Sequence, residues 1–253
     1  MLRYIVRRYL PFLLLPALHG CVPVFGTPLS LPPKLEAQRD SYEADLNLAF
    51  ASVNRFAAKY DWGIKAEDLV VDWEVFETQG ALWRRILEIE GLPANTPLPT
   101  TGLSATLEEG HLLAVSPTEY QRLHPEYEHG DSAWPELLAH ELVHGLHVAV
   151  LHGNADAMGP TWFFEGLAVV GSGQPFGQGR SFDSNRAALA ALKEPSDPRA
   201  GSYATYAAVV RYFMTKVPLP ELIERAKDAN FEQWLTTRQV ALLSPERSHK
   251  LTR

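Results

Sequence analysis

The sequence predicts an α+β fold in which a small mixed or antiparallel sheet precedes a mainly helical C-terminal part. Three short runs, at residues 68–76, 103–107 and 111–116, have the composition of strands. From residue 133 onward the apolar residues recur at helical spacing instead. With 253 residues, 46% of them hydrophobic, the chain can build a real core as one large domain or as a small and a medium one.

The first twenty residues have the composition of a secretory signal. Three arginines precede an apolar run at residues 9–18, which is too short to span a membrane comfortably. Residues 18–21 (LHGC) resemble the lipobox of bacterial lipoproteins, in which the cysteine is lipidated and becomes the mature N-terminus. We therefore expect a lipoprotein signal peptide at residues 1–20 and a lipid on Cys21. A plain secretory peptide or an uncleaved anchor is the alternative.

This N-terminus also indicates the compartment and the partners. Cys21 is the only cysteine, which excludes an internal disulfide. We expect a Pro-rich tether at residues 21–34 between a lipid bilayer and the folded part. By lipoprotein sorting rules, Val22 points to the outer membrane of a bacterial cell envelope, facing the periplasm. Without residues 1–20, which hold three Arg and no acid, the formal net charge changes from -7 to -10, and an acidic chain without a basic cluster excludes nucleic acid.

The region 35–102 predicts a helix, a strand and a second helix. Apolar residues recur at steps of three to four between residues 35 and 60, as in an amphipathic helix. The run DLVVDWEVF at 68–76 predicts a strand. Thr78 is expected to cap the second helix, which ends at Gly91 and is followed by a Pro-rich loop.

The next two strands are expected to form a hairpin. Residues 103–107 and 111–116 are separated only by Glu-Glu-Gly. A strand just before the helix that follows is expected to lie at the sheet edge, where it would hold an extended peptide by main-chain hydrogen bonds. An ordinary edge strand is the alternative.

Two loops are expected near this part of the fold. Residues 119–130 are polar, and the spacing of His124 and His129 fits neither a helical face nor a strand face. The Gly-rich connector at 171–179 lacks the Lys-Ser/Thr ending of a phosphate loop, and we interpret it as a mobile loop beside a cleft.

The stretch AHELVHGLHVAVLHG at residues 139–153 contains the pattern H-E-x-x-H. Residues four apart lie one above the other on a helix, so His140 and His144 can offer two imidazoles to one ion, with Glu141 beside them. The surrounding residues are apolar on nearly all sides, which predicts a helix buried in the core. Because a buried polar side chain without a partner costs about 1 to 3 kcal/mol, a metal would explain three such groups. A partly exposed helix with solvated histidines is the alternative.

A zinc hydrolase usually needs a third protein ligand and keeps one position for water. The downstream candidates are His147, His152, Asp156 and Glu165. His147 would stretch away from an ion centred on the two earlier histidines, and His152 and Asp156 belong to a loop region. Glu165 is the lone acid of an apolar helix that Thr161 is expected to cap, next to the small Gly166, which would permit close helix approach. A salt bridge to an arginine is the alternative explanation of this acid.

Together these two segments resemble the gluzincin metallopeptidases, specifically the peptidase MA-like families. Their hallmark is H-E-x-x-H, followed some twenty residues later by W-x-x-E-G-x-A. Here HELVH at 140–144 and WFFEGLA at 162–168 match it, with twenty residues between His144 and Glu165. The metzincin pattern does not fit, because its third histidine would fall at Val150.

The resemblance implies a zincin-like catalytic domain at residues 103–240, with an edge strand above the zinc-binding helix. The region 35–102 would pack on this domain, and a polar tail would follow at 241–253. The resemblance also implies that a tyrosine near the downstream pattern Y-x7-R-Y donates a hydrogen bond to the oxyanion. Tyr203 is the first choice and Tyr206 the second, with plain core packing as the alternative for either.

These features predict a lipid-anchored, zinc-dependent peptidase that acts on peptides or proteins. One Zn²⁺ is expected on His140, His144 and Glu165, where it would lower the pKa of a water to about 7. Glu141 would take the proton and deliver it to the leaving amine. The alternative is a catalytically silent binding or chaperone-like lipoprotein that keeps the same fold.

Overall fold

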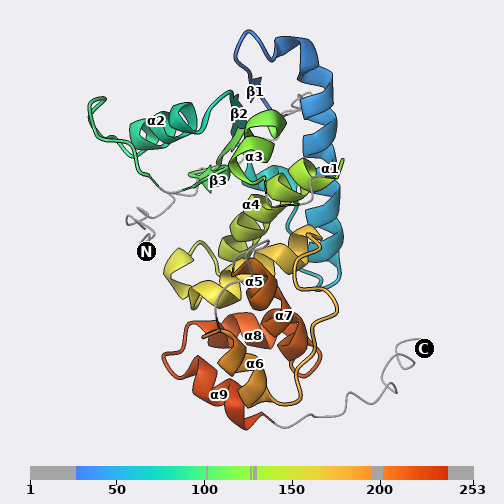
Figure 1. The fold of residues 1–253 in the computed structure, drawn as a ribbon. Coiled ribbons are helices and arrows are strands. Elements are labelled where there is room, and N and C mark those ends of the chain that lie inside the picture. Colours follow the sequence, from blue (N-terminus) through green and yellow to red (C-terminus); the bar gives the residue numbers. More distant parts are fainter. Residues whose placement is uncertain (1–26, 101, 126, 128–129, 195–201, 239–253) are drawn as a thin grey trace, which may run out of the picture.

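The structure is a computed structural model that describes residues 27–238 apart from residues 101, 126, 128–129 and 195–201. Over this part the fold is mixed α+β, with a four-stranded sheet and nine α-helices, which confirms the predicted class (Figure 1). In chain order the elements are β1 (Leu29–Ser30), α1 (Arg39–Ala58), β2 (Asp72–Phe76), α2 (Gln79–Ile89), β3 (Ala105–Glu108), β4 (His111–Val115), α3 (Pro117–Leu123), α4 (Ala133–Val150), α5 (Thr161–Ser172), α6 (Asn185–Ala191), α7 (Tyr203–Met214), α8 (Leu219–Ala226) and α9 (Phe231–Thr237).

The sheet is mixed, with the strand order β1-β2-β4-β3. β1, β2 and β4 are parallel, and β3 is antiparallel to β4. The register places Val75 of β2 opposite Ala114 of β4, and Leu112 of β4 opposite Leu107 of β3. The predicted hairpin is confirmed as β3 and β4. The last strand before α4 is β4, which lies between β2 and β3 and is not at an edge as expected, because β2 pairs with its other side. The edge strand of the hairpin is β3.

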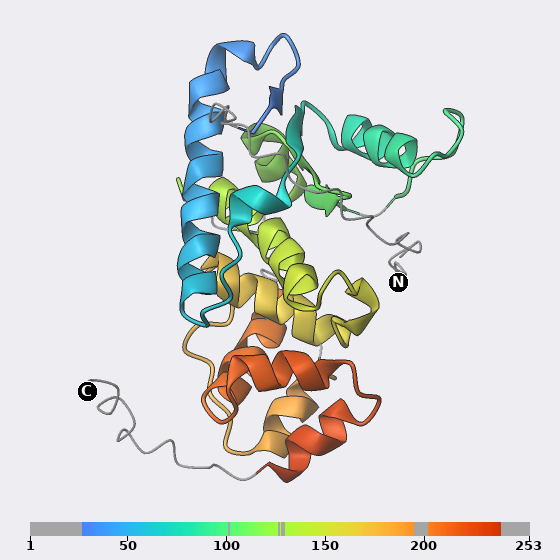
Figure 2. The same cartoon turned by 180° about the vertical axis from the view of Figure 1, so that it is seen from behind.

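Different helices pack on the two faces of the sheet. Trp73 of β2 contacts Tyr42 of α1 and Trp134 of α4, with ring centroids 6.4 and 6.1 Å apart. Side chains alternate along a strand, so Glu74 points to the other face, where Arg85 of α2 donates a hydrogen bond to it. Figures 1 and 2 show α2 projecting on this side, away from α1.

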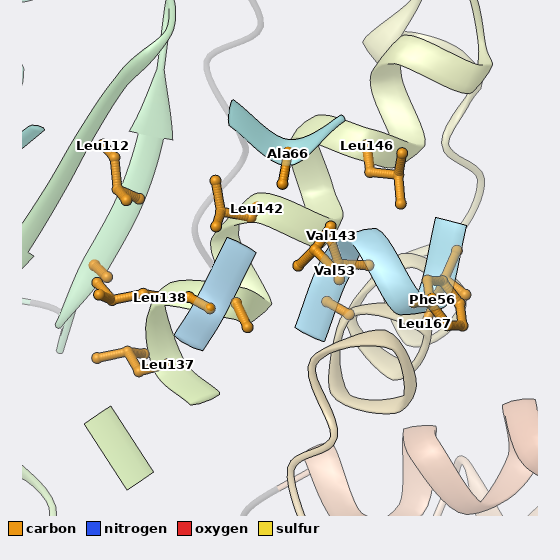
Figure 3. Close-up of a cluster of buried hydrophobic side chains, with 14 of the residues drawn as sticks. Val53, Phe56, Ala66, Leu112, Leu137, Leu138, Leu142, Val143, Leu146 and Leu167 are labelled. Carbon is orange, nitrogen blue, oxygen red and sulfur yellow. The ribbon is translucent and has the colours of Figure 1, made fainter. Parts of the chain in front are cut away.

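α4 lies at the centre of the molecule. α1, α5 and the strands β3 and β4 pack around it, and Figure 3 shows its apolar side chains among those of its neighbours. Leu138, Leu142, Val143 and Leu146 are at most 1% exposed. The predicted burial of this helix is confirmed, so its polar side chains also lie largely away from bulk water.

α5 packs between α4 and α7, and glycines allow both approaches. A Cβ added at Gly171 would lie 2.8 Å from Cγ2 of Val143 in α4. At Gly166 it would lie 2.6 Å from the carbonyl oxygen of Tyr206 in α7. The expected close approach at Gly166 is therefore present, but toward α7, and Gly171 makes the approach to α4.

Two predicted boundaries differ from the structure. The predicted strand at 68–76 begins instead as a 3-10 turn at Ala66–Leu69, because Asn54 of α1 accepts a hydrogen bond from the first N–H of that turn at 2.8 Å. The strand itself comprises only the last five residues of the segment. Thr161, expected to cap the helix of Glu165, is the first residue of α5, and Pro160 occupies the N-cap position.

Two segments that were expected to be irregular contain short regular elements. β1 lies within the predicted tether at 21–34 and pairs with β2. α3 occupies the start of the predicted loop at 119–130, and its cap is the Ser116 hydroxyl, which accepts a hydrogen bond from the Glu119 N–H. Both elements are too short to show a hydrophobic period, which is why the sequence did not predict them.

The predicted signal peptide at residues 1–20, Cys21 and the polar tail at 241–253 lie outside the described residues. Within the described part, no helix is both long and apolar enough to cross a membrane. Region 35–102 supplies β2, which lies between β1 and β4. Residues on both sides of position 103 therefore share one sheet and one hydrophobic core.

Candidate metal centre

α4 brings His140 and His144 together on one of its faces. Their Nε2 atoms lie 3.1 Å apart, and the rings meet edge to face with centroids separated by 4.8 Å. His140 is buried and His144 is partly buried. The helical spacing of four residues produces this arrangement, as the sequence predicts.

Glu165 of α5 completes a group of three. Its Oε2 lies 3.2 Å from Nε2 of His140 and 3.4 Å from Nε2 of His144. The chain reverses direction over residues 151–160, and α5 then packs back against α4 with this carboxylate buried. The alternative of a salt bridge to arginine is not seen among the described residues, where the ionic partners of Glu165 are the two histidines.

The spacing of these three atoms fits a zinc ion. A tetrahedral ion with bonds of about 2.0 to 2.2 Å holds its ligand atoms about 3.3 to 3.6 Å apart, close to the 3.1, 3.2 and 3.4 Å found here. Two imidazoles and one carboxylate are also a usual donor set of catalytic zinc, which keeps a fourth position for water. His140, His144 and Glu165 therefore fit one Zn²⁺.

The other candidate ligands lie outside this group. His147 is buried with its ring centroid 5.9 Å from that of Phe163, and neither ring nitrogen has a hydrogen-bond partner among the described residues. His152 and Asp156 are exposed at the end of α4 and in the following turn. The group of converging ligand atoms around His140 includes none of these three.

A second group of possible ligands lies on the sheet, formed by Asp72, Glu74 and His111. Nδ1 of His111 is 2.7 Å from Oδ1 of Asp72. Arg85 donates to Glu74 at 2.8 Å. Since each carboxylate already has a partner, ordinary polar pairing explains this group.

Burial and mutual contact shift the pKa values of the central residues. Burial raises the pKa of Glu165, but the positive charge of His144 and the hydrogen bonds with both histidines outweigh it and hold this pKa far below its usual range. Burial lowers the pKa of His140, but the hydrogen bond with Glu165 and the charge of Glu141 raise it overall. Burial raises the pKa of Glu141 to about 6, which suits a group that accepts and releases a proton near neutral pH.

A pocket of about 100 Å³ opens beside His140 and Glu141. Residues 102–105, which lead into the edge strand β3, form part of its wall. Rings supplied by Tyr120 of α3 and Phe176 form another part. The pocket thus joins the sheet edge to the candidate metal centre.

The structure distinguishes the two candidate tyrosines. Tyr203 lines the pocket, and its ring meets that of His140 edge to face with centroids 5.7 Å apart. Tyr206 lies almost one turn further along α7, packs against the hydrophobic core and is not part of the pocket wall. Geometry therefore favours Tyr203 as the residue that can reach a bound substrate.

Two residues of this site had no recognisable signal in the sequence. Gln174, in the connector interpreted as a mobile loop, places its Oε1 2.9 Å from Nδ1 of His140. His124 follows the last residue of α3 and is a loop residue as expected, and its Nε2 lies 2.9 Å from the Ser104 hydroxyl in the pocket wall. His129 lies outside the described residues. No spacing rule relates a residue to a partner 20 or 34 positions away, which is why both contacts were missed.

Comparisons with protein-family models, with curated proteins and with solved structures found no significant match to this chain.

Proposed function

We propose that this protein is a zinc-dependent peptidase of the gluzincin type, with a zincin-like fold. The observation that supports the proposal most directly is the convergence of His140, His144 and Glu165, whose ligand atoms lie 3.1 to 3.4 Å apart. Glu141 lies next to this group and lines an accessible pocket. This combination matches the needs of metal-assisted hydrolysis.

Each residue has a separate role in the proposed reaction. When bound by His140, His144 and Glu165, zinc would activate a water and polarise the substrate carbonyl. Glu141 takes a proton from the attacking water and delivers it to the nitrogen of the leaving amine. The Tyr203 hydroxyl donates a hydrogen bond to the carbonyl oxygen as negative charge develops on it.

A peptide is the substrate class that this fold favours. β3 is an edge strand packed beside α4, so an extended peptide can pair with its main chain. The pocket wall includes residues 102–105, which reach the first residue of β3, and also Glu141. A paired peptide would direct one side chain into this pocket, where Tyr120 and Phe176 favour an apolar group.

We also infer that the enzyme works at a membrane surface. Residues 18–21 resemble a lipobox, so a lipid on Cys21 would hold the folded part at a bilayer. The residue after the cysteine points to the outer membrane of a bacterial cell envelope, with the site facing the periplasm. Proteins and peptides of that compartment would be the accessible substrates.

The Glu141→Gln variant tests the proposed mechanism. The amide cannot accept the proton, so peptidase activity on a mixed peptide library should fall by about 100- to 10,000-fold. Zinc content of the purified protein should stay the same, since Glu141 is not a ligand. Glu224→Gln, the same change at an exposed position of α8, serves as the control and should leave both quantities unchanged.

Two results would contradict the proposal. Full activity of Glu141→Gln, or wild-type activity that resists removal of zinc by a chelator, would show that the reaction does not use this site. Zinc bound by a wild-type protein that cleaves nothing would favour the silent binding or chaperone-like lipoprotein instead.

A further inference from the structure

His140 has a second buried polar partner besides Glu165. Its Nδ1 lies 2.9 Å from Oε1 of Gln174, a side chain that is only 5% exposed just after α5. An amide oxygen only accepts hydrogen bonds, so Nδ1 carries a proton, and in the neutral ring, once Nε2 has released the proton that it shares with Glu165, the lone pair is on Nε2. Gln174 thus selects the tautomer of His140 that can bind a metal.

His144 has no equivalent partner. Its Nδ1 is buried and makes no hydrogen bond with any residue that the structure describes. Its ring is positioned by packing, for example edge to face with Phe164 at a centroid distance of 5.7 Å. The polar contact that orients an imidazole from outside the ligand group is therefore the one from Gln174.

Arg211 of α7 anchors the loop that contains Gln174. Its guanidinium donates hydrogen bonds to the main-chain oxygens of Gln174, at 3.3 Å, and of Phe176. Arg211 is partly buried, which lowers its pKa, and its hydrogen-bond partners among the described residues are these two oxygens. Because a buried charge without partners is costly, the loop and the guanidinium hold each other in place.

The same loop contributes to the pocket. Phe176 lines the pocket beside Glu141. Tyr203, at the start of the helix that contains Arg211, lines it as well. Arg211 therefore joins the loop that orients a candidate metal ligand to the helix that presents Tyr203.

We propose that Gln174 is a positioning residue that orients His140 for zinc, and that Arg211 holds the connecting loop where Gln174 reaches His140 and Phe176 closes the pocket. The inference rests on the proposed zinc site. It assigns control of zinc affinity to two residues that do not touch the ion.

Competition with a chromophoric chelator, on the full chain and its variants, measures the zinc affinity. Gln174→Leu keeps the size of the side chain but removes the acceptor, and should lose about 10- to 100-fold in affinity. Gln174→Glu keeps an acceptor and makes the imidazole more basic, so it should bind zinc at least as tightly as the wild type. Gln178→Leu, the same change at an exposed position of the same loop, is the matched control and should bind like the wild type.

Arg211 is tested through two readouts. Arg211→Met removes the hydrogen bonds that anchor Gln174 and Phe176, so it should weaken zinc binding by about the same 10- to 100-fold. It should also raise KM for peptides, because the pocket wall loses its support. Circular dichroism of the metal-free proteins checks that each variant is folded.

The outcomes separate this inference from the proposed function. A wild-type protein that binds no zinc would overturn both. Zinc binding by the wild type together with equal affinity in Gln174→Leu would overturn only the role of Gln174. If Gln174→Leu does not fold, the comparison of Gln174→Glu with Arg211→Met decides, and equal zinc affinities in these two variants would contradict the proposal.

Discussion

His147 shows at the scale of one residue how burial sets side-chain chemistry near the candidate metal centre. It is 2% exposed, and neither of its ring nitrogens bonds to a described residue. Burial, together with the nearby charge of His144, lowers its pKa from 6.5 to about 3. His147 is therefore neutral in the folded protein over the whole physiological range, which suits a packing role better than a role in proton transfer.

This burial predicts acid sensitivity. Between pH 6.5 and about 3 the unfolded chain binds a proton at this position that the folded protein does not bind, so stability decreases as the pH falls through that window. In His147→Leu this contribution should disappear, and the free energy of unfolding at pH 7 should increase by about 1 kcal/mol, because two nitrogens that no described residue pairs with leave the core.

Urea unfolding of the metal-free protein and the variant at pH 7 and pH 5 measures both effects. Metal-free samples are needed because zinc binding itself depends on pH. The same loss of stability between pH 7 and pH 5 in the two proteins would show that His147 is not responsible for it.

At the scale of the elements, the position of α5 decides whether the three ligands can meet. α4 supplies two of them, and α5 supplies Glu165 only because it packs closely against both α4 and α7. A glycine of α5 lies at each of these two contacts. Gly171 approaches Val143 of α4, and Gly166 approaches the main chain of Tyr206 in α7. These contacts determine the position of α5 relative to α4, and therefore the distance from Glu165 to the two histidines.

Gly166→Ala should disturb this packing. The new methyl group would lie 2.6 Å from the Tyr206 carbonyl oxygen. This oxygen belongs to the backbone of α7, which cannot move at one residue without shifting the helix. We expect a loss of about 1 to 3 kcal/mol in the free energy of unfolding, measured by urea titration. Zinc affinity should fall as well, because Glu165 is the neighbouring residue.

Gly80→Ala is the matched control for this variant. Gly80 also lies in a helix, α2, but a Cβ there would meet only Leu98 Cδ1 at an ordinary 3.7 Å. Since alanine is the better helix former, this change should increase stability by about 0.5 to 1 kcal/mol. Equal effects of the two substitutions would show that the contact with α7 is not tight.

At the scale of the whole molecule, the candidate metal centre joins two halves of one core. α4 packs with the sheet and α1, whereas α5 packs with α7 and leads into the C-terminal helices shown in the lower part of Figure 1. An ion held by His140, His144 and Glu165 would link α4 to α5 directly. Zinc should therefore stabilise the fold as well as support the chemistry.

Removal of zinc should lower the melting temperature. At a free zinc concentration 1,000 times the Kd, binding adds about 4 kcal/mol, which corresponds to about 8 to 16 °C in Tm for a domain of this size. Scanning calorimetry with and without a chelator measures the shift. Glu141→Gln should keep it and Glu165→Gln should lose most of it, whereas a chelator-independent Tm would indicate that no structural link forms.

The sequence by itself determined the features that depend on local spacing. The pair His140 and His144 follows from the helical repeat, because four residues turn the chain once and place both rings on the same face. The β3–β4 hairpin and the burial of α4 follow in the same way from hydrophobic patterns over neighbouring residues. For this reason the α+β class could be predicted without a structure.

Only the tertiary structure decided which distant residues meet. It showed that Glu165 Oε2 lies 3.2 Å from His140, that Gln174 approaches the other nitrogen of the same ring, and that Tyr203 rather than Tyr206 lines the pocket. It also revealed β1 and α3, which are too short for a periodic pattern. These contacts depend on how the helices pack and on the conformations of the loops between them. The same sequence spacing allows many loop conformations, and packing of the complete core stabilises one of them.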